Sequence, residues 1–151
     1  MSDSLLGNKL VAQIGIIVKD IEKTSAAVAK FLGVEKPAWT LTAPLEEAHT
    51  EHRGKPSKAR AKLAFFELEN IQLELIEPDH EPSVWREFLD THGEGVHHIA
   101  FIVKGMPEKI NLLAQNNFPL IQKGGYPGGC YSYIDTSGSL KVILELLENY
   151  D

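Results

Sequence analysis

The chain has 151 residues, of which 43% are hydrophobic and 24% are charged, and its net charge is −6. This length and composition fit one globular domain with its own core, so we expect a single domain over residues 1–151. The acidic balance argues against nucleic acid and anionic membranes as partners, because both require a basic surface. The lone cysteine, Cys130, excludes an intramolecular disulfide and a cysteine metal cluster, and it favours a cytoplasmic setting.

Membrane and export signals are not evident in the sequence. No stretch approaches the ~20 apolar residues of a membrane-spanning helix. Met1–Lys9 contains no long apolar run, so no signal peptide is expected.

The first half of the chain predicts a strand, a helix and three further strands. The helix is expected over Ile21–Phe31, with Asp20 as its N-cap and Gly33 as its stop. The polar, proline-containing stretch Ala43–Ser57 predicts a long loop, and long loops in compact domains are often functional. Alternating or continuous apolar runs predict the strands at Val11–Val18, Lys36–Thr42, Lys62–Leu68 and Ile71–Glu77.

The second half predicts the same order after a linker helix at Val84–Thr91. A further helix is expected over Pro107–Asn116. The glycine-rich segment Lys123–Gly129 predicts a loop, and Thr136–Ser139 predicts a turn. The strands are predicted at Val96–Val103, Phe118–Gln122, Cys130–Asp135 and Lys141–Leu147.

An internal duplication connects the two halves. The letters QIGIIVKD (13–20) align with HIAFIVKG (98–105), and IQLELIE (71–77) aligns with VILELLE (142–148). The predicted fold class is therefore α+β, with two copies of one βαβββ module. The first copy spans residues 10–78, a helical linker spans 79–95, and the second copy spans 96–148.

The duplication places polar side chains at equivalent positions inside apolar strands. Gln13 is equivalent to His98, and Glu74 is equivalent to Glu145. A buried carboxylate without a partner costs several kcal/mol. Two such carboxylates call for a shared positive charge, so the sequence predicts a divalent-metal site made by Gln13, Glu74, His98 and Glu145. The alternative for His98 taken alone is a hydrogen-bonded core residue.

The donor set limits the choice of metal and of chemistry. One imidazole nitrogen, two carboxylates and one amide oxygen, with no sulfur, suit Co²⁺, Ni²⁺, Mn²⁺ or Zn²⁺, and the sequence does not choose among them. Non-haem iron oxygenases use two histidines and one carboxylate, so ring-cleaving dioxygenase chemistry is disfavoured here.

Other polar clusters carry weaker hypotheses. The basic run Arg53, Lys55, Lys58, Arg60 and Lys62 predicts contacts to an anionic small-molecule substrate, with a solvated loop as the alternative. A second cluster in the same region is interpreted as a solvated loop: His49, Glu51 and His52.

Three segments resemble the vicinal oxygen chelate superfamily, which includes glyoxalases, bleomycin-resistance proteins and dioxygenases. They are IGIIVKDIEK (14–23), FFELENIQLELIEP (65–78) and HGEGVHHIAFIVKG (92–105). The likeness runs from about Leu10 to Leu147 and is greatest to methylmalonyl-CoA epimerases. It implies two βαβββ modules that form a cup-shaped mixed sheet around a metal, with the helices outside, in a homodimer.

The resemblance also implies the metal ligands and leaves the reaction open. Epimerases usually have histidine at the position of Gln13, whereas some glyoxalase I enzymes are similar to this chain in their Gln/Glu/His/Glu order. Some epimerases also carry an acid near the start of the third strand, where this chain has Ala61–Ala64. We expect Glu46, Glu47 or Glu51 to be the substitutes available for that acid.

Three functions follow from the resemblance. The first is a metal-dependent isomerase, epimerase-like, that moves a proton next to the carbonyl of an acyl-CoA-type substrate, with Glu145 as ligand and base. The second is a glyoxalase I-like lactoylglutathione lyase acting on a thiol–methylglyoxal hemithioacetal. The third is a non-catalytic small-molecule binding or resistance protein.

Overall fold

The computed structural model describes residues 4–151. The first three residues of the Met1–Lys9 segment therefore lie outside the described residues. None of the described helices is both long enough and apolar enough to cross a membrane.

The first module contains one long helix and the strands around it. Helix α1 (Ile21–Leu32) begins where the Asp20 side chain accepts a hydrogen bond from the Lys23 N–H, and it ends at Gly33, whose φ is 71°. Both caps are those expected from the sequence. The four strands of this module are β1 (Gln13–Ile17), β2 (Thr40–Leu41), β5 (Ala61–Glu67) and β6 (Gln72–Pro78).

The second module repeats this order after helix α3 (Val84–His92). Ser83 caps α3 by accepting a hydrogen bond from the Arg86 N–H. The helix of this module is α4 (Met106–Gln115), and a single helical turn, α5 (Ser137–Leu140), precedes its last strand. The four strands are β7 (Gly95–Ile102), β8 (Leu120–Tyr126), β9 (Gly129–Ile134) and β10 (Ile143–Asn149).

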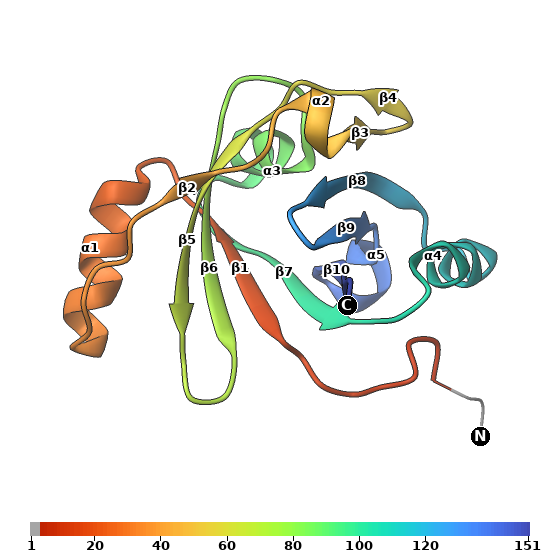
Figure 1. The fold of residues 1–151 in the computed structure, drawn as a ribbon, viewed down its shortest axis with the longest axis horizontal. Helices are drawn as coiled ribbons and strands as arrows, with labels where there is room; N and C mark the ends of the chain where they lie inside the picture. Colours follow the sequence, from red (N-terminus) through yellow and green to blue (C-terminus); the bar gives the residue numbers. More distant parts are fainter. Residues whose placement is uncertain (1–3) are drawn as a thin grey trace.

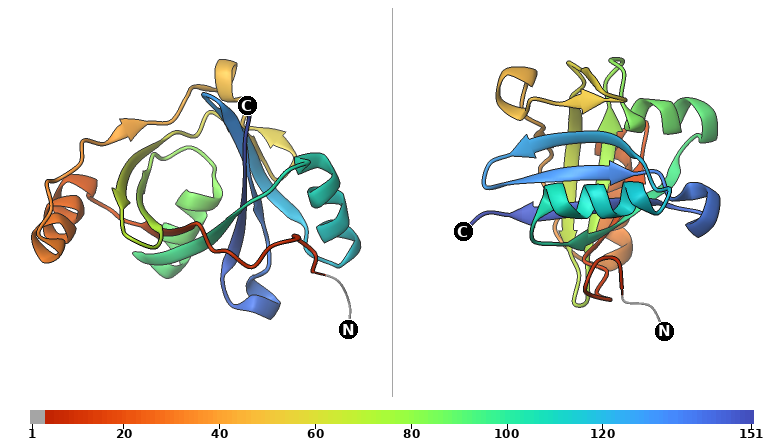
Figure 2. Two further views of the ribbon diagram at one scale, coloured as in Figure 1. Left: turned by 60° about the horizontal axis from the view of Figure 1, so that its bottom comes forward. Right: turned by 90° about the vertical axis from the view of Figure 1, so that its right-hand side faces the viewer.

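All strands of residues 4–151 join one mixed sheet of ten strands in the order β2-β5-β6-β1-β7-β10-β9-β8-β3-β4. Strands β1 and β7 meet antiparallel at its centre, and each lies parallel to the last strand of its own module, β6 or β10. The two modules therefore have the same internal pairing and meet through the same strand. The sheet curls into a cup with α1 and α4 outside it (Figures 1 and 2), and this confirms the predicted α+β fold. Helix α3 instead packs against the inner face.

The core consists of three apolar clusters, one for each of the larger helices. The clusters of α1 and α4 lie on the outer face of the sheet, and the cluster of α3 lies on the inner face. Helix α1 covers a cluster around Leu75, and α4 covers a cluster around Leu146. Helix α3 contributes Val84, Trp85 and Leu89 to the third cluster, which includes Ile17 and Tyr133. Trp85 and Tyr133 connect this cluster to the cavity described below.

Two predicted loops are wrong, because both contain strands of the sheet. Ala43–Ser57 contains the short helix α2 (Leu45–Ala48) and strands β3 (Glu51–His52) and β4 (Lys55–Pro56), and β3 pairs with β8. Most of Lys123–Gly129 belongs to β8. A Cβ at Gly124 would lie 2.9 Å from the Tyr131 ring, so glycine is needed there for close packing rather than for a loop.

Two smaller differences concern strand ends. Only Thr40–Leu41 of the predicted strand Lys36–Thr42 is paired in the sheet. The predicted turn at Thr136–Ser139 extends into α5, so the following strand starts at Ile143 instead of Lys141.

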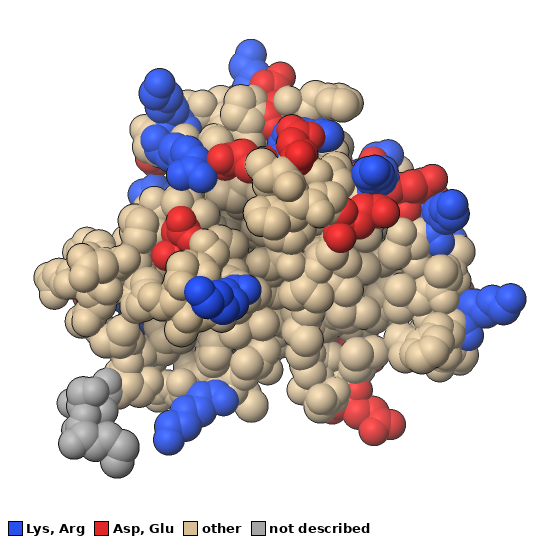
Figure 3. Space-filling model, turned by 180° about the vertical axis from the view of Figure 1, so that it is seen from behind, with Lys and Arg blue, Asp and Glu red and all other residues tan. Residues whose placement is uncertain are grey.

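The surface charges are mixed rather than segregated on the face seen from behind. On this face, Lys and Arg side chains are interspersed with Asp and Glu side chains (Figure 3).

Candidate functional site

Two rows of residues across the four central strands position the candidate site. In one row, Gly15 on β1 lies between Glu74 on β6 and His98 on β7. In the other row, Ala100 on β7 lies between Gln13 on β1 and Glu145 on β10. Each residue of one row is equivalent, through the duplication, to a residue of the other row. Side chains that share a face of adjacent strands lie close together, so the four polar groups converge.

Small residues at Gly15 and Ala100 make this convergence possible. A Cβ at Gly15 would lie 2.0 Å from Cε1 of His98, which no real contact allows. The His98 imidazole therefore occupies the space that a side chain at position 15 would fill. Ala100, the equivalent residue in the second module, is fully buried between Gln13 and Glu145.

The imidazole Nε2 of His98 is the centre of the cluster. It lies 3.0 Å from Oε1 of Gln13, 3.2 Å from Oε1 of Glu145 and 3.4 Å from Oε1 of Glu74. The candidate ligand atoms of Glu74, His98 and Glu145 all lie within 4.8 Å of one another. All four side chains are buried, and His98 is 0% exposed. The structure thus brings together all four residues that the sequence predicted as metal ligands.

Two carboxylate oxygens in this cluster lack the partners that burial requires. Within the described residues, Oε1 of Glu74 and Oε1 of Glu145 are buried without a hydrogen bond of good geometry. A single N–H on His98 can serve only one of the three oxygens around it. Unpaired buried acceptors beside two negative charges are the chemistry that a divalent cation satisfies, so this donor set fits a metal ion.

A second histidine, His97, orients the first. The register of β1 and β7 shifts between Gly15 and Ile16, which leaves His97 as an extra, bulged residue. Its Nδ1 lies 3.0 Å from Nδ1 of His98. Burial, followed by the nearby charge of His98, holds the pKa of His97 well below its usual value. Neutral His97 can therefore accept the Nδ1–H of His98, which leaves Nε2 of His98 free as a ligand atom.

The carboxylates control the charge of His98 in the metal-free protein. Burial by itself would lower its pKa, but the charges and hydrogen bonds of Glu145 and Glu74 outweigh burial and raise it from 6.5 to about 9. Burial raises the pKa of Glu74, and the Glu145 charge adds to that effect. A proton on His98 and a divalent ion would thus meet the same need for positive charge.

The stability of the metal-free protein is expected to fall as the pH rises from 6.5 to about 9. A folded-state pKa above the unfolded value gives stability that is complete below pH 6.5 and is lost through the folded pKa of about 9. The loss should be on the order of 2–3 kcal/mol. Urea unfolding across this range, with chelator present, would measure it. A His98→Gln/Glu74→Gln/Glu145→Gln control, which removes the three coupled groups, should show a flat profile, and a profile equally steep in that variant would contradict the assignment.

A chain of amides and one further carboxylate orients Gln13. Its Nε2 donates to Oε1 of Gln72 over 2.6 Å, and Nε2 of Gln72 donates to Oε1 of Glu67 over 2.5 Å. The first bond uses the amino group of the Gln13 amide, so its carbonyl oxygen points to His98, and the second bond holds Gln72 in place. The sequence analysis assigned no role to Gln72, Glu67 or His97. The adjacent histidines at 97 and 98 were one available signal, and the strand period of two, which places Gln72 on the same face as Glu74, was another.

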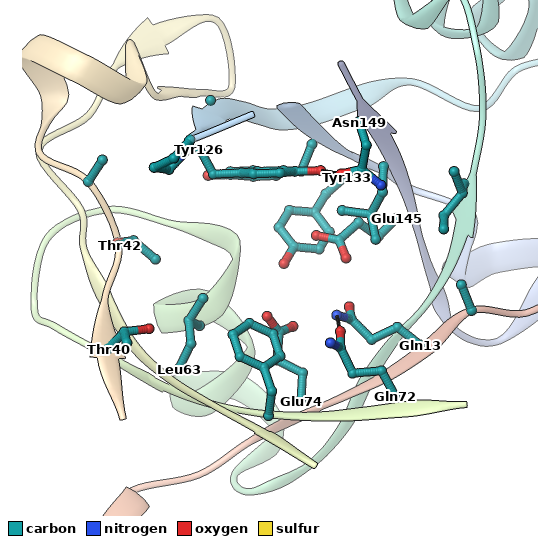
Figure 4. Close-up of a pocket in the computed structure, with 18 of the residues that line it drawn as sticks. Gln13, Thr40, Thr42, Leu63, Gln72, Glu74, Tyr126, Tyr133, Glu145 and Asn149 are labelled. Atoms are coloured by element: carbon teal, nitrogen blue, oxygen red, sulfur yellow. Dashed lines mark hydrogen bonds between the residues drawn. The ribbon is translucent and has the colours of Figure 1, made fainter. Parts of the chain in front are cut away.

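The site opens into a cavity of about 690 Å³ on the inner face of the cup. Gln13, Glu74 and Glu145 line its inner end, together with Tyr133 (Figure 4). The Tyr133 hydroxyl accepts a hydrogen bond from Nε1 of Trp85 over 2.9 Å, so its own proton remains available to an oxygen in the cavity. Burial, with the charges of Glu145 and Glu74 added to it, keeps the pKa of Tyr133 well above its usual value.

The basic run is placed elsewhere. None of the described residues that line the cavity is Lys or Arg. Arg53 pairs with Glu87 at 3.0 Å, Lys62 lies 3.5 Å from Glu77, and Lys55 is exposed. Arg60 donates through Nε to the Thr42 carbonyl over 2.8 Å. The predicted contact of Arg53, Lys55, Arg60 and Lys62 with a substrate stays a prediction, and it would have to lie outside the cavity.

The predicted loop acids are also absent from the cavity wall. Glu46 and Glu47 belong to α2, and Glu51 lies 3.8 Å from Nζ of Lys123. His52 contacts Oε1 of Glu87 at 2.6 Å. The wall carboxylates in the described chain are Glu67, Glu74 and Glu145.

Comparison with known proteins identifies the family to which this chain belongs. The sequence profile of the Glyoxalase/Bleomycin resistance protein/Dioxygenase superfamily matches residues 12–133. The chain belongs to this superfamily. Members are typically divalent-metal-dependent, and the buried Glu74–His98–Glu145 group agrees with that property.

Individual relatives of the superfamily agree with the fold. The uncharacterized protein YqjC of Bacillus subtilis (strain 168) is 31% identical over 100 residues, which are 64% of this chain and 71% of that protein. A hypothetical protein of Bacillus halodurans C-125 is 25% identical, with a TM-score of 0.64 over 93% of this chain and 94% of the other. Methylmalonyl-CoA epimerase from Mycobacterium tuberculosis is 21% identical, with a TM-score of 0.61 over 100% of this chain and 93% of the other. At that identity the epimerase match establishes the fold alone.

Proposed function

We propose that this chain is a divalent-metal-dependent enzyme that moves a proton on a carbon next to a carbonyl group, like methylmalonyl-CoA epimerase. The observation that carries the proposal is the convergence of Gln13, Glu74, His98 and Glu145 at the inner end of the cavity, with two buried carboxylate oxygens left unpaired. Epimerases of this fold supply the first candidate substrate, an acyl-CoA-type thioester.

The proposed ion is one of Co²⁺, Ni²⁺, Mn²⁺ and Zn²⁺, held by these four residues. Bound there, it would act as a Lewis acid toward a substrate oxygen next to the reacting carbon. Gln13 and His98 would be neutral ligands in this arrangement. His97 can accept the Nδ1–H of His98 and Gln72 accepts from the amino group of Gln13, so Nε2 of His98 and Oε1 of Gln13 are left for the ion. The two glutamates then carry the negative charge of the site.

Glu145 is the proposed base. Glu145 lines the cavity, and its Oε1 lies 3.2 Å from Nε2 of His98 without a hydrogen bond, so the carboxylate can take a proton from the substrate carbon. Glu74 lines the same cavity from β6, three strands away in the sheet order, with its Oε1 equally free. Two carboxylates on different strands can serve the two faces of one carbon, which is what epimerisation requires. Tyr133 can donate its hydroxyl proton to a developing oxyanion.

A glyoxalase I-type lyase is the second candidate function. The observation that favours it is the amide at position 13, because the Gln/Glu/His/Glu order is similar to that of some glyoxalase I enzymes. The proton would then move between adjacent carbons of a thiol–methylglyoxal hemithioacetal. The same base, Glu145, would serve both reactions.

Metal analysis of the purified protein tests the proposal first. We expect about one divalent transition-metal ion per chain, and loss of that ion in a Glu74→Ala/His98→Ala double variant. The metal should raise the free energy of unfolding by about 2.7 kcal/mol at a hundredfold excess over its dissociation constant. Absence of binding after each of the four ions is added would reject the enzyme and leave a small-molecule binding protein.

Substrate assays on the metal-loaded protein separate the two reactions. Racemisation of methylmalonyl-CoA, measured as deuterium exchange at its C2, would support the epimerase. Thioester formation from a methylglyoxal–glutathione adduct would support the lyase. The homodimer implied by the family resemblance and the cytoplasmic setting expected from Cys130 stay predictions.

A further inference from the structure

The charges on the cavity wall are all of one sign. The described lining residues include the carboxylates of Glu67, Glu74 and Glu145 and no Lys or Arg side chain. The remaining polar lining groups are neutral hydroxyls and amides, among them Thr40, Thr42, Tyr126 and Asn149 (Figure 4). An anionic group brought between these walls would lose water and meet like charge, which makes its entry costly.

The metal proposed for this site does not reverse that balance. A divalent ion carries two positive charges, which Glu74 and Glu145 balance. Glu67 then adds a negative charge further along the wall, where it accepts the hydrogen bond from Gln72. The wall therefore offers no surplus positive charge to a substrate anion beyond the metal ligands.

Most of the cavity away from the ligands is apolar. Strand β5 contributes Leu63 and Phe65, with Leu41 beside them on β2, and the opposite wall carries Tyr126 and Leu147. A volume of about 690 Å³ lies within the range of roughly 300–1,000 Å³ that holds drug-sized molecules. An alkyl or aromatic group of the substrate would bury apolar surface against these side chains.

From this we infer that the part of the substrate held inside the cavity is uncharged and largely apolar, an alkyl or aryl group attached to the carbonyl-bearing head. The inference rests on the proposed function, because it assumes that the head binds at the metal. It narrows the substrate class: any anionic portion, such as the phosphates of a coenzyme, must remain outside the cavity. For the body of the acyl group, a branched or aromatic chain is thereby favoured over one that ends in a free carboxylate. A carboxylate on the reacting carbon itself, as in methylmalonyl-CoA, belongs to the head.

Three hydroxamates with the same chelating head test the inference on protein loaded with one Co²⁺ per chain. Acetohydroxamic acid has no apolar body, benzohydroxamic acid has a neutral aromatic body, and 4-carboxybenzohydroxamic acid has a charged one. Titration calorimetry should show that the neutral aromatic compound binds roughly tenfold tighter, or more, than either of the others. Equal or tighter binding of the carboxylated compound would overturn the inference.

A lysine introduced into the cavity wall tests whether the discrimination between charged and neutral hydroxamates occurs in the cavity. Leu41 lines the cavity and is 46% exposed on an edge strand, so Leu41→Lys should fold. This variant should bind the carboxylated compound several-fold tighter than the unaltered chain does, with acetohydroxamic acid unchanged. Val34→Lys is the matched control, because Val34 is 51% exposed and lies outside the lining. An equal gain in both variants would overturn the inference.

Failure of the proposed function gives a different result. If protein that retains its metal binds none of the three hydroxamates, the metal has no position open to a substrate. That outcome rejects the enzyme proposal, and the inference with it. A reversed order of affinities rejects the inference alone.

Discussion

Replacing Glu145 by glutamine is expected to lower the rate of proton transfer roughly 10²–10⁴-fold, which is the usual contribution of a general base. The amide keeps the size of the side chain and an oxygen that can face His98, but it cannot accept a proton from carbon. This step is measured directly by the exchange of the substrate α-proton with deuterium. The metal-loaded variant catalyses the exchange, and NMR detects it. Metal content should be measured on the same sample, since Glu145 is also a proposed ligand.

Glu148→Gln is the matched control on the same strand. Its carboxylate accepts hydrogen bonds from the N–H groups of Gly105 and Met106 at the start of α4, outside the cavity lining. We expect its exchange rate to stay close to that of the unaltered chain. A Glu145→Gln protein that holds metal and exchanges at a near-normal rate would contradict the base assignment.

Gly15→Ala is expected to destabilise the fold by about 1–3 kcal/mol and to abolish tight metal binding. The new methyl group would lie 2.0 Å from the His98 ring, and both are buried between adjacent strands. The ring must therefore leave the position in which its Nε2 meets Gln13, Glu74 and Glu145. Chemical denaturation measures the stability, and titration with Co²⁺ measures the affinity.

Two further variants make the Gly15 prediction specific. Gly138→Ala places the same methyl group in open space on α5, so it should be neutral or slightly stabilising. In a His98→Ala background, Gly15→Ala should cost little, because the ring it displaces is gone. A double-mutant cycle with no coupling between positions 15 and 98 would show that the contact is not the cause.

The fold class and the ligand set followed from the sequence by one route. Strands impose a period of two on side chains, so polar residues inside apolar strands mark one face. The duplication adds a second condition: equivalent positions of the two modules converge if the modules pack about an approximate twofold axis. Gln13, His98, Glu74 and Glu145 satisfied both conditions, and the structure brings them together. Caps such as Asp20 and Gly33 were equally predictable, because they act within one turn of helix.

The wrong predictions concern segments whose strand partners the local sequence pattern did not reveal. The glycine-rich end of β8 forms a strand because it pairs with β9 in a hairpin. Glu51–His52 has weak strand propensity, and it forms a strand because it pairs with Gln122–Lys123 of β8, some seventy residues away in the sequence. Local pattern carries no information about such a partner. The basic run is a similar case. Its sequence shows that these residues are charged, but not that they lie outside the cavity.

By itself, the sequence determined the duplicated α+β architecture and the identity of four converging polar side chains. These depend on periodicity and local caps, which neighbouring residues encode. Only the tertiary structure decided that Gly15 makes room for His98, that a bulge brings His97 to its Nδ1, and that Gln72 and Glu67 orient Gln13. It also decided the charge of the cavity wall. Each of these depends on the register between strands from distant parts of the chain, which is fixed only when the whole sheet assembles.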